Sequence, residues 1–157
     1  MREHTEVQLT VNGRSHTLTI GAPPADVDPA DTLARTLRDV LGLKGTKVSC
    51  DHGACGMCTV LLDGRAVLSC MTLTVECDGR SVVTVEGLAD PETGELHPLQ
   101  QSFVDHTAFQ CGYCTPGILM SAKASCTSPK VGAGFSSSRA FALMRMPGVQ
   151  YPHWKAV

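Results

Sequence analysis

The sequence predicts an α+β protein, in which a sheet-forming N-terminal part is followed by a helical C-terminal part. Two observations support this prediction. Before residue 87, apolar and polar residues alternate in several short runs, as in strands with one buried face. After residue 88, beyond a stretch rich in Pro, Gly and acidic residues, apolar residues recur at helical spacing instead. We therefore expect two domains, residues 1–87 and 88–157.

Two hairpins and one further strand make up the expected sheet. The first hairpin turns at Asn12-Gly13, between alternating runs that extend from residue 7 to residue 20. The second turns at Asp63-Gly64 and joins residues 59–62 to residues 66–68. Asn-Gly and Asp-Gly are preferred in type I′ turns, because both positions need a positive φ. A β-branched run at residues 81–85 is expected to complete the sheet.

Helices are expected in three places. The first lies between the hairpins, where Asp31 is a capping residue type and Gly42 a typical stop. Its expected apolar face consists of Leu33, Leu37, Val40 and Leu41. Residues 97–106 show a second helical pattern. The third helix is expected to follow Thr115 as its N-cap and to continue to Ala124.

The most informative stretch is the loop between the first helix and the second hairpin. Cys50, Cys55 and Cys58 follow the C-x4-C-x2-C spacing of a plant-type [2Fe-2S] site, with a fourth thiol at Cys70. Thiolates from one loop reach two neighbouring irons only if the backbone curls tightly, and the glycines between the ligands permit this curl. Two strands, a helix and such a loop open a plant-type ferredoxin of the β-grasp fold.

Two other interpretations of these cysteines stay open on spacing alone. A structural zinc site usually takes its ligands from two short C-x2-C hooks far apart, whereas here three thiols share one loop. Disulfides are typical of secreted chains, and the N-terminal residues show no apolar signal segment. The iron–sulfur interpretation ranks first, zinc second and disulfides third.

Composition argues against several other classes of protein. The net charge of −2 provides no basic surface for nucleic acid, and no apolar run is long enough to cross a membrane. The sequence contains no phosphate loop, dinucleotide fingerprint or Ser-His-Asp set, so no catalytic residue is predicted. We expect a cytoplasmic protein that binds neither nucleic acid nor membrane.

Two motifs together resemble the small iron–sulfur subunit of the molybdenum hydroxylases, the family of xanthine dehydrogenase, aldehyde oxidase and carbon monoxide dehydrogenase. The motifs are CDHGACGMCTVLLDG, with Cys70 downstream, and QCGYCTPGILMSA at residues 110–122. The resemblance implies an N-terminal β-grasp domain and a C-terminal four-helix domain, each with one [2Fe-2S] cluster. One small departure is Ser49, where the family often has Gly.

The resemblance also implies roles for individual residues. The ligands of the cluster nearer the flavin would be Cys50, Cys55, Cys58 and Cys70. Cys111 and Cys114 would supply half the ligands of the cluster nearer the molybdenum cofactor. Gln110 would lie against the pterin of that molybdopterin cofactor.

The family closes its second cluster with a C-x-C pair that this sequence lacks. Cys126 is the only cysteine after Cys114, and residues 142–151 read ALMRMPGVQY where the pair is expected. Two or three thiolates are too few for a [2Fe-2S] site with four Cys ligands.

A shifted reading frame would restore the pair. Met is encoded by ATG, so if the Arg145 codon is CGN, Met144 before Arg145 and Met146 before Pro147 each place the Cys codon TGC one base later, and that frame spells Cys-Gly-Cys. We hypothesise that the sequence after about residue 124 is out of frame, through a sequencing error or a true frameshift. The alternative is a divergent C-terminus whose second cluster is lost or altered. The intact mass of protein from the native source decides between them.

The resemblance implies that the chain is an electron-transfer subunit. It would relay electrons from a large molybdopterin-binding subunit to FAD on a medium-sized subunit, or to another acceptor, in a dimer of heterotrimers. The isolated chain is expected to show no turnover. A stand-alone ferredoxin-like carrier is the alternative, and a zinc-binding interaction module is a third class.

Overall fold

The computed structural model describes residues 5–21 and 25–127 of the chain. A five-stranded sheet has the strand order β2-β1-β5-β3-β4. Its strands are β1 (Thr5–Val11), β2 (Arg14–Ile20), β3 (Thr59–Leu62), β4 (Arg65–Leu68) and β5 (Ser81–Val83). The central pair β1 and β5 is parallel, and the other neighbours are antiparallel, so the sheet is mixed. This confirms the α+β class and is consistent with the expected β-grasp sheet.

Both predicted hairpin turns are confirmed. Asn12 and Gly13 have φ values of 50° and 79°, and Asp63 and Gly64 have values of 48° and 78°. Positive φ at both central positions is the type I′ geometry that matches the twist of the flanking strands. The last strand is shorter than predicted, because it ends at Val83 and the chain turns into a 3₁₀ helix, η4 (Val85–Gly87).

The first helix differs from the prediction in its cap and in its face. It consists of α1 (Leu33–Arg35) and a π-helical continuation, η1 (Thr36–Val40). Thr32 is the N-cap, because its hydroxyl accepts from the Arg35 N–H at 3.4 Å. The prediction that Asp31 is the N-cap is wrong, because the Asp31 carboxylate forms an ion pair with the Arg35 side chain instead. A π-helical turn contains more residues than an α-helical turn, so Val40 leaves the buried face and is 39% exposed.

The remaining elements are mostly helical. Two 3₁₀ helices, η2 (Ser69–Met71) and η3 (Thr74–Cys77), connect β4 to β5. They are followed by α2 (Pro98–Asp105) and α3 (Thr115–Thr127), so the third predicted helix begins at its expected cap residue and extends beyond Ala124. In residues 88–127 the structure describes these two α-helices, and the implied four-helix arrangement is not confirmed.

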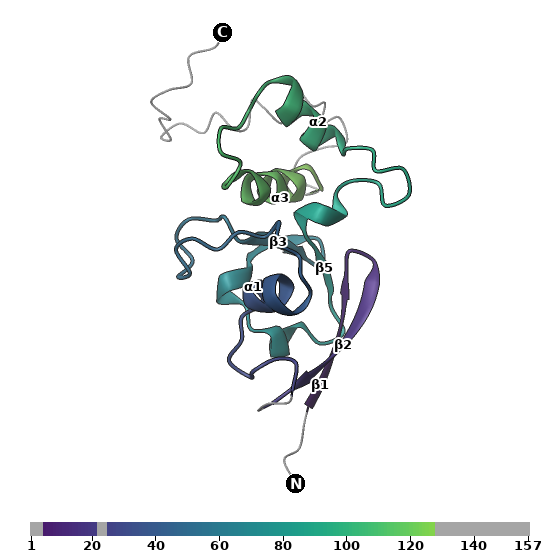
Figure 1. Ribbon diagram of the computed structural model, residues 1–157, viewed down its shortest axis with the longest axis vertical. Helices are drawn as coiled ribbons and strands as arrows, with labels where there is room; N and C mark the ends of the chain where they lie inside the picture. The colour runs from purple at the N-terminus through teal and green to yellow at the C-terminus, as the bar shows by residue number, and fades with distance from the viewer. Residues whose placement is uncertain (1–4, 22–24, 128–157) are drawn as a thin grey trace.

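The sheet separates two apolar cores. The first core lies under the α1–η1 helix and includes Val60 and Leu62 of β3, together with Leu33 and Leu37. The second lies under α3 and includes Leu61, Phe103 and Met120. All four residues of β3 are buried, because alternate side chains enter opposite cores. Figure 1 shows the resulting stack, with α3 between α2 and the sheet.

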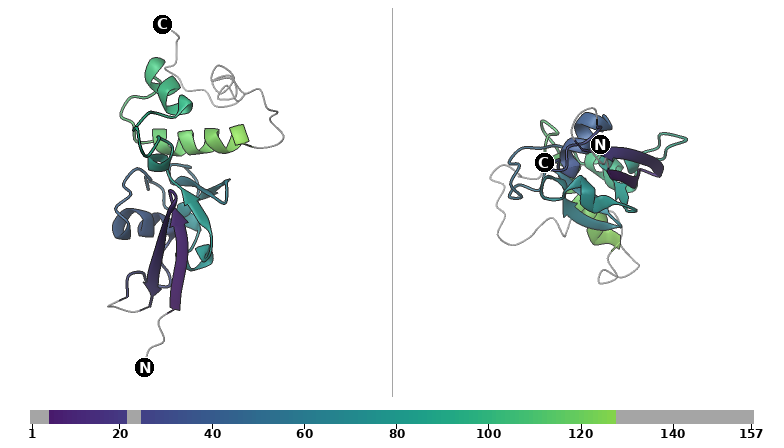
Figure 2. Two further views of the ribbon diagram at one scale, coloured as in Figure 1. Left: turned by 90° about the vertical axis from the view of Figure 1, so that its right-hand side faces the viewer. Right: turned by 90° about the horizontal axis from the view of Figure 1, so that it is seen from below.

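The left view of Figure 2 shows α3 from the side, lying above the sheet and below α2, while the helix at α1 flanks the strands. In residues 5–21 and 25–127, no helix combines the length and the apolar character that a membrane span requires.

Candidate metal centre

The predicted iron–sulfur loop runs from the end of the first helix to β3, and we refer to residues 48–58 as the cluster loop. Gly53 and Gly56 have φ values of 80° and 74°, which confirms that positive φ is needed between the cysteines. Cys58, the residue before β3, and Cys70, in η2, are buried. Cys50 is half-buried and Cys55 is exposed. The four thiols therefore extend from the protein interior to the surface.

The four thiols form an outer pair and an inner pair. The outer pair is Cys50 and Cys55, where the Cys55 N–H donates to the Cys50 sulfur at 3.4 Å. The inner pair is Cys58 and Cys70, which are buried together in one small cluster with Ala34. A [2Fe-2S] cluster with four Cys ligands needs this kind of donor set, with two thiolates for each of two adjacent irons.

Cys50 and Cys70 lie in opposite electrostatic environments. Backbone N–H groups of His52 and Cys55 donate to the Cys50 sulfur, the latter at 3.4 Å, and lower the pKa of that thiol to about 6. Burial, and after it the hydrogen bond that the Cys70 thiol donates to Cys58, raise the pKa of the Cys70 thiol to about 11. The Cys50 thiol is therefore preorganised as thiolate. The Cys70 thiol must release its proton when a metal binds, because metals coordinate the deprotonated sulfur.

The donor chemistry fits an iron–sulfur cluster. All eight cysteines lie within the described ranges, and all are free thiols rather than disulfides. In the same part of the chain, no three His, Cys, Asp or Glu side chains gather around a single point as they would for one metal ion. Soft thiolates in adjacent pairs, with backbone N–H groups aimed at sulfur, are the donors that iron–sulfur clusters use.

The second cysteine motif forms a short hook between α2 and α3. Gly112 adopts a φ of 76°, which lets the chain reverse between Cys111 and Cys114. Both thiols are exposed, as is Gln110 beside them. Cys126 is separate from the hook, since it packs partly buried against the second core. The expected C-x-C position and the frame hypothesis fall in residues 128–157, outside the described residues.

Sequence reasoning missed two residues that join the hook to the cluster loop. The Tyr113 hydroxyl donates to the Val48 carbonyl at 2.6 Å. Gly117, in the first turn of α3, lies directly against the backbone at Gly56 and Met57. A glycine inside a helix is a signal that could have been used, because it weakens the helix unless close packing requires it. No pattern in the sequence indicates the partner of Tyr113.

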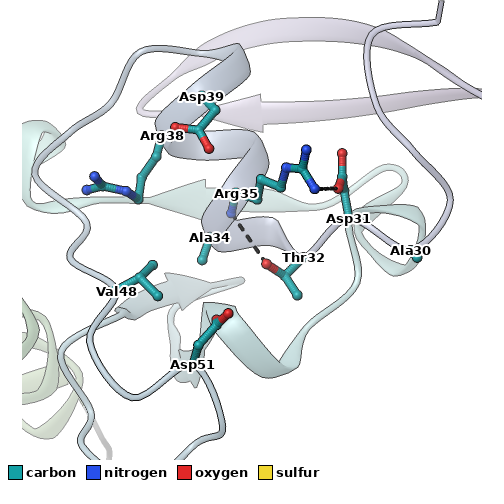
Figure 3. A pocket seen from close by; sticks show the side chains of 9 residues that line it. All are labelled: Ala30, Asp31, Thr32, Ala34, Arg35, Arg38, Asp39, Val48 and Asp51. Carbon is teal, nitrogen blue, oxygen red and sulfur yellow. Dashed lines mark hydrogen bonds and ion pairs between the residues drawn. The ribbon is translucent and has the colours of Figure 1, made fainter. Parts of the chain in front are cut away.

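A cavity of about 400 Å³ lies between the first helix and the cluster loop (Figure 3). Its lining residues are Ala30, Asp31, Thr32, Ala34, Arg35, Arg38, Asp39, Val48 and Asp51. They contribute carboxylates and guanidinium groups but no thiol. Arg38 is committed to the loop backbone, because its Nη1 donates to the Thr46 carbonyl at 2.6 Å and to the Lys44 carbonyl at 3.3 Å.

Comparison with known proteins gives the same division of the chain into two metal-binding motifs. Residues 11–83 match the family described as a 2Fe-2S iron–sulfur cluster binding domain, and residues 84–139 match the family described as a [2Fe-2S] binding domain. The first match contains the cluster loop and Cys70, and the second contains the hook.

Two relatives are similar to this chain over about three quarters of its length. The nicotine 6-hydroxylase small subunit of Paenarthrobacter nicotinovorans is 49% identical over 120 residues, which cover 76% of this chain and 67% of the relative. The aldehyde oxidoreductase iron-sulfur-binding subunit PaoA of Escherichia coli K12 is 47% identical over 116 residues, covering 74% of this chain. The chain spans less than half of PaoA, 47% of its length.

A solved structure has the same fold. The structure of quinoline 2-oxidoreductase from Pseudomonas putida 86 superposes with a TM-score of 0.76 at 35% sequence identity. The superposition covers 98% of this chain and 88% of the matched chain.

Proposed function

Because this chain belongs to the family of small [2Fe-2S] subunits of the molybdenum hydroxylases, we propose that it relays electrons within a multi-subunit oxidoreductase. The observation that carries the proposal is the presence of the cluster loop and the C-x2-C hook in one chain, in contact with each other. A simple ferredoxin has no need of the hook. The chain contributes no catalytic residue, so turnover requires the partner subunits.

The first set of thiols is proposed to hold one cluster, and its residues are Cys50, Cys55, Cys58 and Cys70. A bound [2Fe-2S] cluster supplies one-electron redox chemistry. The inner thiols would hold their iron on the buried side of the loop, because Cys58 and Cys70 are both buried. The hydrogen bonds that backbone N–H groups donate to the Cys50 sulfur stabilise its negative charge. Such hydrogen bonds are one way in which a protein sets the reduction potential of a cluster.

The hook is proposed to hold the second cluster and to face the molybdenum subunit. Cys111 and Cys114 provide two thiolates, which is half of a complete ligand set. Gln110 is exposed at the same surface, so a pterin on a partner subunit can reach its side-chain amide. The frame hypothesis accounts for the other two ligands, because it restores a C-x-C pair in the C-terminal residues.

The partners follow from the same proposal. A large subunit would carry the molybdopterin cofactor, a medium subunit would carry FAD, and two such heterotrimers would form a dimer in the cytoplasm. The exposed thiols of Cys55, Cys111 and Cys114 lie where partner subunits would cover them. We place the boundary between the two domains at residue 87, with residues 88–157 contributing to a four-helix domain.

Iron content and colour test the proposal. Protein isolated anaerobically should be red-brown, with about four Fe per chain if both clusters form and about two if only the first does. Gel filtration should show a stable complex with two larger chains. An iron-binding monomer would favour the stand-alone carrier. A colourless chain without iron would contradict both, and zinc in its place would indicate a structural module.

A further inference from the structure

The hook contacts the start of the cluster loop through Tyr113. Its hydroxyl donates to the carbonyl of Val48, 65 positions away in the sequence. Val48 lies two residues before Cys50, and its side chain packs with Ala34 against the buried thiols of Cys58 and Cys70. The Tyr113 side chain therefore joins the hook to the first residue of the cluster loop. That residue, Val48, packs against the inner thiol pair.

Gly117 contacts the other end of the cluster loop. A Cβ at this position would collide with the carbonyl oxygen of Gly56 and would lie 2.8 Å from the Cα of Met57. These are main-chain atoms between Cys55 and Cys58, so they cannot swing aside like the end of a side chain. The Gly56 carbonyl is held further, since it accepts from the Thr59 hydroxyl at 2.6 Å and from the Thr59 N–H at 3.2 Å.

We propose that Tyr113 and Gly117 are positioning residues that clamp the hook onto both ends of the cluster loop. The clamp holds Cys111 and Cys114 at a fixed separation from the first thiols and holds the loop backbone around those thiols. The inference rests on the proposed function, because a fixed separation matters only if both sets bind clusters that exchange electrons. Electron transfer slows steeply with distance, so a small displacement of α3 would slow it.

The clamp also links a residue of α3 to the properties of the first cluster. An added methyl group at position 117 would push on the Gly56–Met57 backbone, which lies between two proposed ligands. The N–H groups of this loop then change their orientation toward the sulfurs, and hydrogen bonds to sulfur are a determinant of cluster potential. A residue outside the ligand set should therefore alter the redox and magnetic properties of the first cluster.

Two substitutions in the iron-containing full chain test the clamp. Hydrogen–deuterium exchange should follow residues 46–58 and 113–120, while EPR and redox titration follow the first cluster. Tyr113→Phe removes one hydroxyl and should speed exchange near Val48 about fivefold. Gly117→Ala should speed exchange in both segments about tenfold or more, with shifted EPR g-values and midpoint potential.

Ser125→Ala is the matched control, because Ser125 lies exposed on the same helix and its hydroxyl donates to the Ser121 carbonyl within that helix. It should leave exchange and EPR unchanged. The clamp is overturned if Gly117→Ala also leaves both unchanged and raises thermal stability, as helix propensity alone predicts. If Gly117→Ala speeds exchange but leaves the EPR signal and midpoint potential of the first cluster unchanged, the contact only stabilises the fold. That result would overturn the positioning role.

Two further outcomes are also decisive. If Gly117→Ala does not fold, Tyr113→Phe decides by the same readouts, because it adds no atom. If the wild-type chain binds no iron, the proposed function fails. The exchange comparison on the iron-free chain then still separates a real clamp from none, since unchanged exchange in both variants would overturn it.

Discussion

Cys58 is the proposed ligand most completely enclosed by protein. Cys58 is 2% exposed, precedes β3 by one residue, and is buried in one cluster with Cys70. Cys58→Ser should remove the visible absorption and the EPR signal of the first cluster, because a hydroxyl is a poor ligand where a thiolate is required. Iron content and the visible spectrum measure the effect.

Cys77 supplies the control for that substitution. It is also fully buried, but it lies in the first core and its thiol donates to the Leu73 carbonyl at 3.5 Å. Cys77→Ala should therefore keep the iron and the spectrum. A Cys58→Ser protein with its full spectrum would show that the ligand assignment is wrong.

Thr107 is a residue whose backbone conformation opposes its side chain. Its φ is 49°, in the left-handed region that β-branched residues avoid. The position ends α2: the Thr107 N–H donates to Val104 and the Ala108 N–H to Phe103, which is the Schellman arrangement that normally has glycine here. Thr107→Gly should stabilise the protein by about 1 kcal/mol.

Chemical denaturation measures this gain. Thr107→Ala is the control, because it removes the branched side chain but retains a Cβ in the left-handed region, so it should recover only part of the stability. Equal stability of the threonine and glycine forms would mean that the backbone strain inferred at this position is absent.

At the scale of the element, α2 depends on a titratable N-cap. The Nδ1 atom of His97 accepts from the Leu99 N–H at 3.1 Å, and the Lys123 ammonium lies 3.0 Å from Nε2. A neutral imidazole can accept at one nitrogen and a protonated ring at neither. Burial, and then the charge of Lys123, hold the pKa of His97 below its ordinary value of 6.5.

This depressed pKa predicts a loss of stability in acid. The unfolded chain binds the proton more readily, so the contribution of His97 is complete above its unfolded pKa and is lost as pH falls through the folded pKa. The thermal midpoint should therefore drop as the pH falls through and below the ordinary histidine value of 6.5. His97→Asn keeps a capping side chain that does not titrate, so its midpoint should fall less. An equal fall in both proteins would contradict the assignment.

The elements that the sequence predicts best are those defined by local chemistry. The turns at Asn12-Gly13 and Asp63-Gly64 follow from residues that tolerate positive φ, and the structure has both. The cap of the first helix is harder to predict, because Asp31 and Thr32 are both capping residue types. Asp31 forms an ion pair with Arg35, and this leaves Thr32 as the N-cap. The π-helical turn of this helix depends on packing against the sheet, which local sequence does not encode.

The candidate site divides in the same way. The spacing of Cys50, Cys55 and Cys58 indicates a cluster loop, because adjacent thiols must converge over a short chain segment. The contacts of Tyr113 and Gly117 join segments far apart in the sequence. These contacts form only when the chain folds. Of the two residues, only Gly117 can be detected in the sequence, because glycine is unfavourable inside a helix.

At the scale of the molecule, Leu61 connects the two halves of the chain. It is 5% exposed and packs in the core formed with α2 and α3, whereas its neighbour Leu62 packs under the first helix. Leu61→Ala and Leu62→Ala remove the same atoms, and each should cost about 2–5 kcal/mol. Leu61→Ala should also loosen α3, whereas Leu62→Ala should loosen the first helix instead.

Denaturation measures the two costs, and hydrogen exchange shows which helix is affected. The comparison is internally controlled, because both residues belong to β3 and differ only in the face they occupy. If α3 keeps its protection from hydrogen exchange in Leu61→Ala, packing of Leu61 does not stabilise α3 on the sheet.

The burial of β3 on both faces limits how this subunit can be divided. A polypeptide truncated after Gly87 would lack α3 and would expose the apolar side chains of Leu61 and Val83 to solvent. Such a fragment should aggregate even with its iron in place. Recombining ferredoxin halves between related enzymes would therefore require exchanging the sheet surface together with the helix that shields it.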